Sequence, residues 1–205
     1  STCTVQTVFS DGELSSGAYG NGAIVVVDGN GFAYPPNEPT KRVDTATSLD
    51  GGNTWTYMLI GSGGNKGMTF ANGSFVTIEH NGGASALWSD DGLNWTRSDL
   101  NIPDWDNGTH LFFAWSGCVG YGDGTWIMSG WMVDWKGSDK DGYPVMRMSK
   151  DNGRTWSGSG MNYDYCFSTI AYGNGVFVAV PATYYTGVAQ GTLYVSTDGG
   201  YNWNL

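Results

Sequence analysis

Short apolar runs alternate with polar turn residues along the chain, and one such pattern recurs four times. Each copy has an aromatic residue, any residue, Asn or Asp, Gly, any residue and then an apolar residue. An Asn-Gly or Asp-Gly pair between apolar segments is the strongest short-range signal of a tight β-hairpin, because both central residues need a positive φ. The copies are Tyr19–Ile24, Phe70–Phe75, Tyr121–Trp126 and Tyr172–Phe177, and their Asn or Asp positions are 51 residues apart.

A second motif, Ser-x-Asp-x-Gly-x-x-Trp, follows in every unit, and we call these segments the Ser-Asp turns. The Ser and Asp oxygens can accept backbone N–H groups within a turn, the Gly permits a left-handed step, and the Trp returns to the core. The second copy is one residue shorter between Asp and Trp. The motif residues are Ser48, Asp50, Gly52, Trp55, Ser89, Asp91, Trp95, Ser149, Asp151, Gly153, Trp156, Ser196, Asp198, Gly200 and Trp203.

Together the two motifs resemble the Asp-box (BNR) repeat family, which includes sialidases and many phage and surface proteins. The resemblance covers the whole chain, and only the second Ser-Asp turn departs from the pattern. It implies an all-β fold, a four-bladed β-propeller-like ring of four-stranded antiparallel blades, with each Ser-Asp turn between the third and fourth strands. In that family the turn is a folding element, so the resemblance implies that its Asp residues are structural rather than catalytic.

The repeat predicts a single propeller domain over residues 1–205, with blade units at about 16–66, 67–115, 116–166 and 167–205. Only two residues follow Trp203, too few for a fourth strand in the last blade. The alternating run 3–9 belongs to no blade, so we predict that it completes the last blade and closes the ring, which removes an open sheet edge. Four blades is the low end for a propeller, so assembly into a homo-oligomer stays open.

Blade geometry predicts two different faces. The Asn-Gly and Ser-Asp turns share one, the turn face, and the longer irregular segments share the other, the loop face, where binding residues usually lie. Aromatic rings beside Asp and Asn suit sugars, because the rings stack on C–H groups while the polar groups bind hydroxyls. The alternative is that these rings pack loops onto blades or line a subunit interface. The candidate ligand-binding residues are Tyr34, Trp105, Trp131, Asp134, Trp135, Tyr143, Tyr184 and Tyr185.

Composition excludes several classes of protein. With 40% hydrophobic residues, the 205-residue chain can bury a core, which argues against disorder despite its 33 Gly. A net charge of −10 disfavours nucleic acid as a partner. We expect no membrane span, because no run of 18 apolar residues occurs, and no signal peptide is visible, because the first ten residues have neither a basic region nor an apolar one. Three scattered Cys and two His argue against a disulfide framework or a zinc site, and we expect no metal and no cofactor.

Catalytic candidates are sparse. Sialidases of the Asp-box family use three arginines around the substrate carboxylate, together with a Tyr/Glu pair and an Asp. Of the four arginines here, Arg154 lies in a Ser-Asp turn and Arg97 just after one, so only Arg42 and Arg147 are expected near the loop face. A two-carboxylate glycosidase needs carboxyl groups about 5–10 Å apart. The carboxylates available for that role are Glu38, Asp104, Asp106, Asp134, Asp139 and Asp141.

We therefore expect a non-catalytic binding or structural module, not an enzyme. The setting that family habit suggests is a virion, as a phage fibre or capsid decoration protein, or a cell surface, as an adhesion protein. Its partner would be a cell-surface glycan or another virion or surface protein. The alternative is a secreted carbohydrate-active enzyme of the glycoside hydrolase or sialidase type.

Overall fold

The computed structural model describes residues 5–31, 33–38, 40–61, 64–79, 85–102, 111–134, 142–158, 166–182 and 191–205. Over these ranges the chain forms only β-strands, bridges, turns and bends. Accordingly, no helical segment in the described part of the chain has the length and apolar character needed to cross a bilayer.

The strands form four antiparallel sheets, in each of which neighbours along the chain pair with each other. The first two sheets contain β1 (Leu14–Gly20), β2 (Ala23–Asp28), β3 (Thr45–Ser48), β4 (Thr56–Met58), and β5 (Asn65–Ala71), β6 (Ser74–Glu79), β7 (Ser85–Ser89), β8 (Thr96–Asp99). The last two contain β9 (Leu111–Gly122), β10 (Thr125–Asp134), β11 (Tyr143–Ser149), β12 (Ser157–Gly158), and β13 (Phe167–Gly173), β14 (Val176–Pro181), β15 (Tyr194–Ser196).

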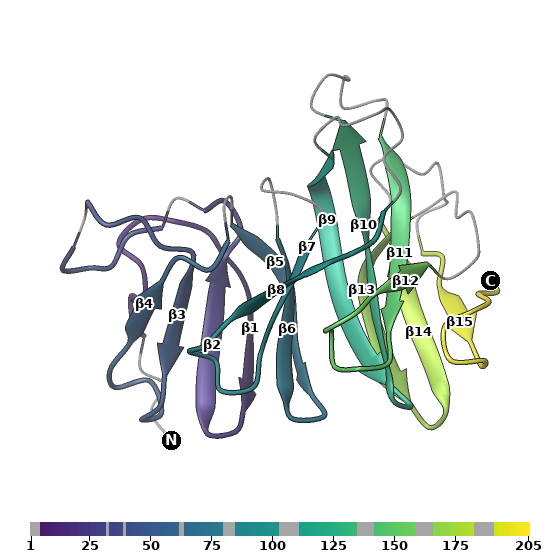
Figure 1. Cartoon of the computed structure of the whole chain (residues 1–205), viewed down its shortest axis with the longest axis horizontal. Helices are drawn as coiled ribbons and strands as arrows, with labels where there is room; N and C mark the ends of the chain where they lie inside the picture. The colour runs from purple at the N-terminus through teal and green to yellow at the C-terminus, as the bar shows by residue number, and fades with distance from the viewer. Residues whose placement is uncertain are drawn as a thin grey trace.

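The sheets stand side by side in chain order, as the blades of a propeller do (Figure 1). Their first strands, β1, β5, β9 and β13, pack against one another in that sequence. The all-β, four-bladed propeller-like fold is therefore confirmed. The first and fourth sheets lie at opposite ends of the row in Figure 1 and are not packed together as adjacent sheets are.

The four predicted hairpin turns are present. Asn21 and Gly22 have φ values of 48° and 80°, and the same left-handed pair recurs at residues 72–73, 123–124 and 174–175. Each turn joins the first and second strands of its sheet. Asn, Asp and Gly are the residues that tolerate this conformation, so the local sequence determines where these hairpins turn.

The Ser-Asp turns share one hydrogen-bond pattern. In the first, the Ser48 hydroxyl accepts the Gly52 N–H at 2.8 Å and donates to the Asp50 carboxylate at 2.8 Å. Asp50 in turn accepts the N–H of Thr54 at 2.9 Å and its hydroxyl at 2.7 Å. In the shorter second copy the Ser89 hydroxyl accepts the N–H three residues on, from Gly92, instead of four, and Asp91 accepts the N–H and side-chain amide of Asn94. The Asp oxygens are used to hold the turn, as expected.

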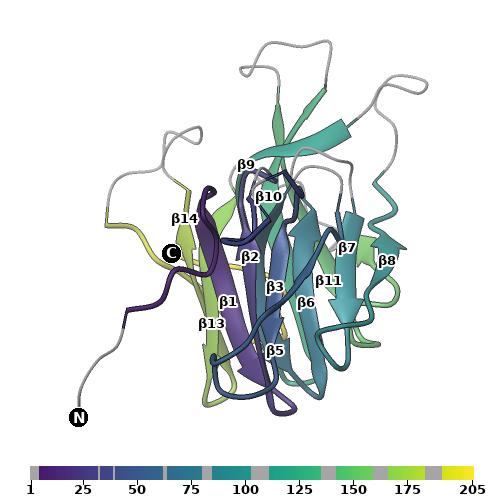
Figure 2. The same cartoon turned by 90° about the vertical axis from the view of Figure 1, so that its left-hand side faces the viewer.

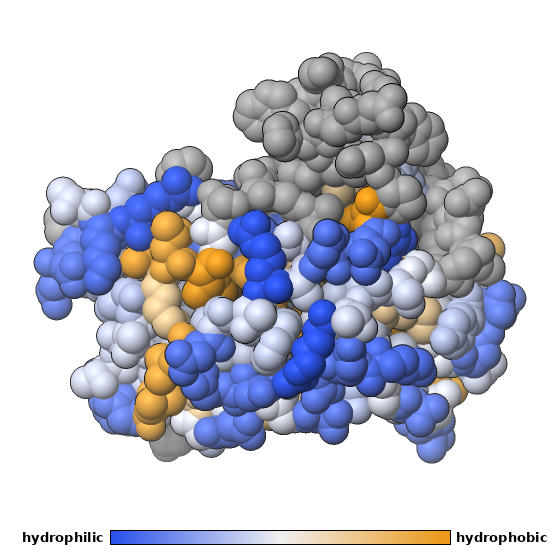
Figure 3. Space-filling model, viewed as in Figure 1, coloured by the Kyte–Doolittle hydropathy of each residue, from blue (hydrophilic) through white to orange (hydrophobic). Residues whose placement is uncertain are grey.

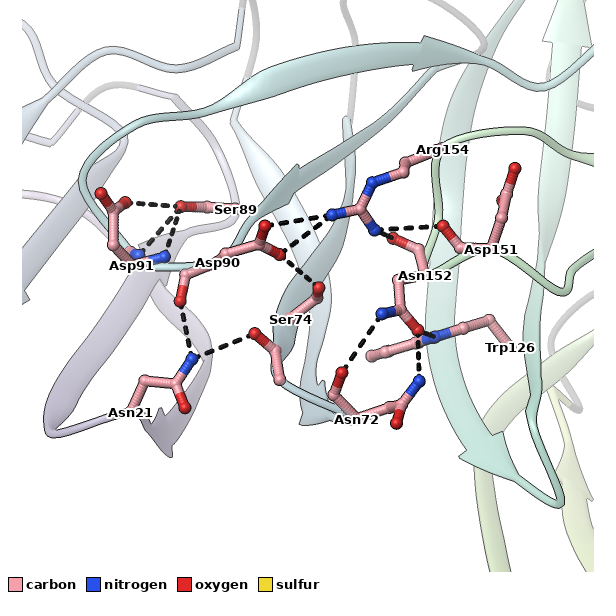
Figure 4. A network of polar contacts seen from close by, with 12 residues as sticks. Asn21, Asn72, Ser74, Ser89, Asp90, Asp91, Trp126, Asp151, Asn152 and Arg154 are labelled. Carbon is pink, nitrogen blue, oxygen red and sulfur yellow. Dashed lines mark hydrogen bonds and ion pairs between the residues drawn. The ribbon is translucent and has the colours of Figure 1, made fainter.

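Side chains of the turn face link neighbouring sheets (Figure 4). Asn21 Nδ2 donates to the backbone oxygens of Gly73 at 3.0 Å and Asp90 at 2.8 Å, which belong to the second sheet. Across the next junction, Asn72 Nδ2 donates to Asn152 Oδ1 at 2.8 Å, and Asn152 Nδ2 donates to the Asn72 carbonyl at 3.2 Å. Hairpin turns and Ser-Asp turns therefore share one face, as predicted, and they connect the blades.

The apolar core lies mainly between adjacent sheets. At the first junction Val25 and Val27 of β2 meet Met68 and Phe75 of the second sheet. Corresponding clusters join the second sheet to the third and the third to the fourth. Of the Ser-Asp turn tryptophans, which we expected in the core, Trp156 and Trp203 are buried, whereas Trp55 and Trp95 are partly buried.

The expected closing strand is the main correction to the fold. Residues 5–9, the described part of the run 3–9, form no strand and do not pair with residues 196–205. Instead Phe9 packs against Ala46 of the first sheet, and the Val8 carbonyl accepts the Tyr57 hydroxyl at 2.9 Å. In the described part of the chain the last sheet has three strands, and Asn204 forms a bridge to Val195 at its outer edge. The apolar side chains of Val8 and Phe9 therefore pack against the first blade and not against the fourth.

Candidate functional site

The third blade extends beyond the others at the loop face. β9 has 12 residues and β10 has 10, whereas the first two strands of every other sheet have six or seven. Figures 1 and 2 show from two directions that this pair rises above the other sheets. We call the projecting segments, residues 111–117 and 130–134, the ribbon. It carries Trp131 and Asp134, and it directly precedes Trp135 in the chain.

Trp131 lies within the ribbon and corrects one expectation. The sequence placed it in an exposed loop, but it belongs to β10, opposite Trp115, with register shifts on both sides of it. Its side chain is only 7% exposed, and a Cβ on Gly142 would lie 2.1 Å from its Nε1, so the indole lies directly on the Gly142 backbone. Such irregularities bend a strand and redirect its side chains. Trp131 therefore packs the ribbon onto the start of β11.

Tyr143 begins β11 at the base of the ribbon, opposite Met132. Its side chain is partly exposed and packs along the core between the second and third sheets. Arg147, on the same strand, donates from Nε to the Leu100 carbonyl and from Nη1 to the Met146 carbonyl, both at 3.0 Å. Burial lowers the pKa of Arg147, and Tyr143 opposes that shift. The base of the ribbon thus presents a ring beside a fixed cation.

The remaining candidate ligand-binding residues do not all lie near the base of the ribbon. Asp134 ends β10 at the tip of the ribbon, paired with Leu111. Tyr34 lies on the first sheet, where its backbone bonds to Ser10 and Asp11 and its side chain is partly buried. It therefore fixes the N-terminal segment and is separate from the ribbon. Trp105, Trp135, Tyr184 and Tyr185 lie outside the described residues, although Trp135 directly follows Asp134 in the chain.

The four arginines are each engaged in separate places. Arg42 donates to the Gly31 carbonyl of the first blade, and Arg147 holds carbonyls at the third. Arg97 pairs with Glu79 at 2.5 Å. Arg154 pairs with Asp90 at 3.0 Å on the turn face and covers the Trp88 ring at 4.1 Å. The structure therefore assembles no cluster of three arginines around one point.

A buried polar cluster between the first two sheets was not predicted from the sequence. Asp44, Asn65 and Glu79 are all fully buried near the loop face. A methyl group added to Gly61 would lie 3.1 Å from Asn65 Oδ1, 3.3 Å from Asp44 Oδ2 and 3.4 Å from Glu79 Oε1. Three side-chain oxygens from three strand ends therefore converge on the Gly61 backbone.

The partners of this cluster are mostly structural. Asp44 accepts the N–H groups of Ile60 and Gly61, each at 2.8 Å, and so holds the connection between the two sheets. Burial raises the pKa of Asp44 despite these bonds, and the neighbouring Asn65 amide partly opposes the shift. The sequence contains one weak sign of this cluster, which is the charged residue Glu79 directly after the apolar stretch of β6. Its proximity to Asp44 follows from the fold and not from the sequence.

Metal-ligating side chains and cysteines do not form a reactive site in the described part of the chain. Among the described residues, no group of three or more His, Cys, Asp or Glu side chains is arranged to hold a metal ion. Cys118 and Cys166 are buried free thiols, as the sequence suggested, and burial raises the pKa of Cys118. A buried thiol of raised pKa is a poor nucleophile, so Cys118 acts as a packing group.

Comparison with known proteins supports the fold. No protein-family model matches the chain, and no curated protein sequence is significantly similar to it. Among solved structures, the α-L-arabinanase of Penicillium chrysogenum, in complex with arabinobiose, matches with a TM-score of 0.50 at 15% identity, over 93% of this chain and 60% of its own. The sialidase of Trypanosoma rangeli, in complex with 2,3-difluorosialic acid, matches with a TM-score of 0.53 at 12% identity, over 94% of this chain and 36% of its own.

These matches have a limited meaning. The chain spans 60% or less of the length of either enzyme. At such identities the likeness shows the β-propeller fold alone, since one fold hosts many unrelated functions.

Proposed function

We propose that this chain is a non-catalytic binding module of the Asp-box propeller type that binds a glycan on the loop face of its third blade. The observation that supports this most strongly is the ribbon, because among the described residues the third blade alone projects a pair of long strands beyond the shared scaffold. Tyr143 lies at its base and Asp134 ends β10 at its tip, and tyrosine and aspartate are residue types that bind sugars.

The engagement of the arginines supports binding without catalysis and points to a neutral glycan. Recognition of a sialic acid carboxylate requires cations, but each arginine bonds to its own carbonyl or carboxylate partner. The net charge of −10 further disfavours an anionic ligand. We propose that neutral sugars, which need stacking and hydroxyl contacts only, are the ligands of this face.

A glycan array with the intact protein tests the proposal. We expect binding to neutral glycans in preference to sialylated ones, without release of sugar products. Tyr143→Ala should reduce binding at least tenfold, whereas Tyr201→Ala, which removes an exposed tyrosine from a Ser-Asp turn on the opposite face, should leave it unchanged. Equal loss of binding in both variants, or no binding to any glycan, would contradict the proposal.

The biological setting is a separate part of the proposal. A virion fibre, a capsid decoration or a cell-surface adhesin each presents a binding face to other surfaces, which fits a rigid scaffold with one projecting blade. The support for this setting is the habit of Asp-box proteins, so immunogold labelling of the source particle or cell is the appropriate test.

A glycoside hydrolase is the alternative, and the convergence of Asp44 and Glu79 near Gly61 is the observation that favours it. Two nearby carboxyl groups, one of raised pKa, are what acid-base hydrolysis requires. Incubation with chromogenic arabinosides and sialosides tests this directly. Turnover that Glu79→Gln abolishes, in a protein that remains folded, would establish the enzyme and displace the binding module.

A further inference from the structure

The junctions between blades repeat one contact between an aromatic ring and a glycine. Phe70 of the second blade lies on Gly20 of the first, so closely that a Cβ on Gly20 would be 2.2 Å from the ring. Tyr172 of the fourth blade lies on Gly122 of the third, where the same distance would be 2.0 Å. At the middle junction Tyr121 occupies the ring position and Ala71 occupies the glycine position, and both pack against the same core cluster.

The two ends of the row carry the unmatched halves of this contact. Tyr19 occupies the ring position in the first blade, and its side chain is 69% exposed. Gly173 occupies the glycine position in the fourth blade, and a Cβ added there would meet no atom within 4 Å. The first blade therefore presents a ring without a glycine, and the fourth presents a glycine without a ring.

The second strands show the same difference. Val25, Val76 and Ile127 occupy one repeat position on the side that faces the following blade, and each is fully buried. Val178 occupies this position in the fourth blade and is only partly buried. Two residues further on, Val180 is 41% exposed. The outer side of the fourth blade is thus an apolar sheet face with the residue pattern of an inter-blade junction.

The N-terminal segment supplies part of the complementary surface. At the junction between the second and third blades, Ser98 of the fourth strand β8 donates to the Gly153 carbonyl of the next Ser-Asp turn at 2.6 Å. On the first blade, residues 5–9 lie beside the equivalent Ser-Asp turn, since a Cβ on Gly52 would be 3.4 Å from Gln6 Oε1. The segment therefore lies on the side of the first blade that a preceding blade would face, and in the described part of the chain the fourth sheet has three strands.

We propose that the outer side of the first blade docks on the outer side of the fourth blade of a second copy of this chain, head to tail. Tyr19 of one copy then covers Gly173 of the other, Val178 and Val180 become buried, and residues 5–9 lie near the outer edge of the fourth sheet, beside the bridge from Val195 to Asn204. Both surfaces belong to this chain, and their equivalents already meet at three junctions within it. Two copies carry eight sheets, the upper end of the range for closed propellers.

Surface charge affects this association. In the view of Figure 3, apolar residues gather mainly on the left, over the first sheet. With a net charge of −10 on each copy, mutual repulsion opposes association. We therefore expect the association to strengthen as salt screens that repulsion, as it does for apolar contacts between like-charged chains.

Light scattering during size-exclusion chromatography of the intact protein measures the result. We expect a mass of twice the 22.0 kDa of one chain, or a higher multiple, with the associated fraction larger at 0.5 M than at 0.05 M NaCl. Tyr19→Ala and Gly173→Leu should each return the mass to a single chain. Neither change disturbs the single copy, because the Tyr19 side chain is exposed and the space at Gly173 is empty.

Tyr201→Ala is the matched control for Tyr19→Ala. It also removes an exposed tyrosine, but the adjacent Gly200 packs on Ile127 of the third blade, away from the proposed interface. This variant should keep the parent mass. A mass of one chain at every protein and salt concentration, or an oligomer that both Tyr19→Ala and Gly173→Leu leave intact, would overturn the proposal. Circular dichroism of each variant verifies that it is folded.

Discussion

At the scale of single residues, the Asp of each Ser-Asp turn acts as a hydrogen-bond acceptor at the protein surface. The hydroxyl and N–H of Thr54 lower the pKa of Asp50 to about 2, and the N–H of Asn94 does the same for Asp91. A carboxylate that accepts several such bonds favours its charged form. These residues therefore couple the stability of the turns to pH.

The expected consequence is a loss of stability in acid. Because these Asp residues bind protons less readily in the folded state, their contribution is complete above about pH 4, near the ordinary Asp pKa, and is lost as the pH falls towards about 2. Thermal melts between pH 7 and pH 2 measure it. The double variant Asp50→Asn/Asp91→Asn should show a shallower decline than the parent protein. Identical pH profiles for the two proteins would rule this explanation out.

Trp131 has a structural role at the same scale. Because the indole is buried on the Gly142 backbone, Trp131→Ala should lower the free energy of unfolding by about 3–5 kcal/mol. Tyr201→Ala, at an exposed position, should change it by less than about 0.5 kcal/mol. Urea denaturation of the two variants measures the difference. A small effect for Trp131→Ala would mean that the ring is available to a ligand after all.

Residue-level predictions from the sequence succeeded where the determining interactions are local. The left-handed residues at Asn21 and Gly22 and the bonds within the Ser-Asp turns depend on a few adjacent residues. The burial of Trp131 depends on Gly142, which lies eleven residues away, just before β11. The hydrogen bond from the Gly61 N–H to Asp44 likewise cannot be predicted without knowing the order of strands in the sheet.

At the scale of elements, the turns of the hairpins connect one blade to the next. Asn152 bonds Asn72 of the second blade in both directions and accepts the buried Trp126 N–H at 3.2 Å. Its φ of 59° is one that glycine also adopts. This residue therefore combines a conformational role with three side-chain hydrogen bonds at a blade junction.

Replacement by glycine separates the two roles. Asn152→Gly keeps the backbone conformation but leaves the Trp126 N–H without its acceptor, so we expect a loss of about 1–3 kcal/mol in unfolding free energy. Asn174→Gly is the matched control, because Asn174 has a φ of 53° and its side chain bonds no described residue. The control should lose less than about 0.5 kcal/mol. Equal losses for the two variants would show that the backbone conformation alone matters.

Predictions of the strands were accurate for the order of strands within each sheet and inaccurate for the length of the first two strands of the third blade. Alternating apolar residues and turn signals were enough to locate the hairpins of each sheet. The ribbon was missed because Trp131–Asp134 was assigned to a loop, although the apolar run from Trp126 continues through it. Pairing with Trp115 and residues before it extends that strand, and this partner segment had no regular pattern of its own.

At the scale of the whole molecule, the two faces have different roles. The turn face holds the Ser-Asp turns and the links between blades, and the loop face carries the ribbon (Figures 1 and 4). The sequence predicted this division from the order of strands within a blade. It did not predict that residues 5–9 pack on the first blade, because their path depends on which surface buries Phe9 better.

Hydrogen–deuterium exchange, with and without the glycan that binds best on the array, tests the division between scaffold and binding face most directly. The ligand should protect backbone amides in residues 130–134 and 142–147, at the ribbon and the start of β11. It should leave the four Ser-Asp turns unchanged. Protection centred on those turns, with none at the ribbon, would contradict the assignment of binding to the loop face.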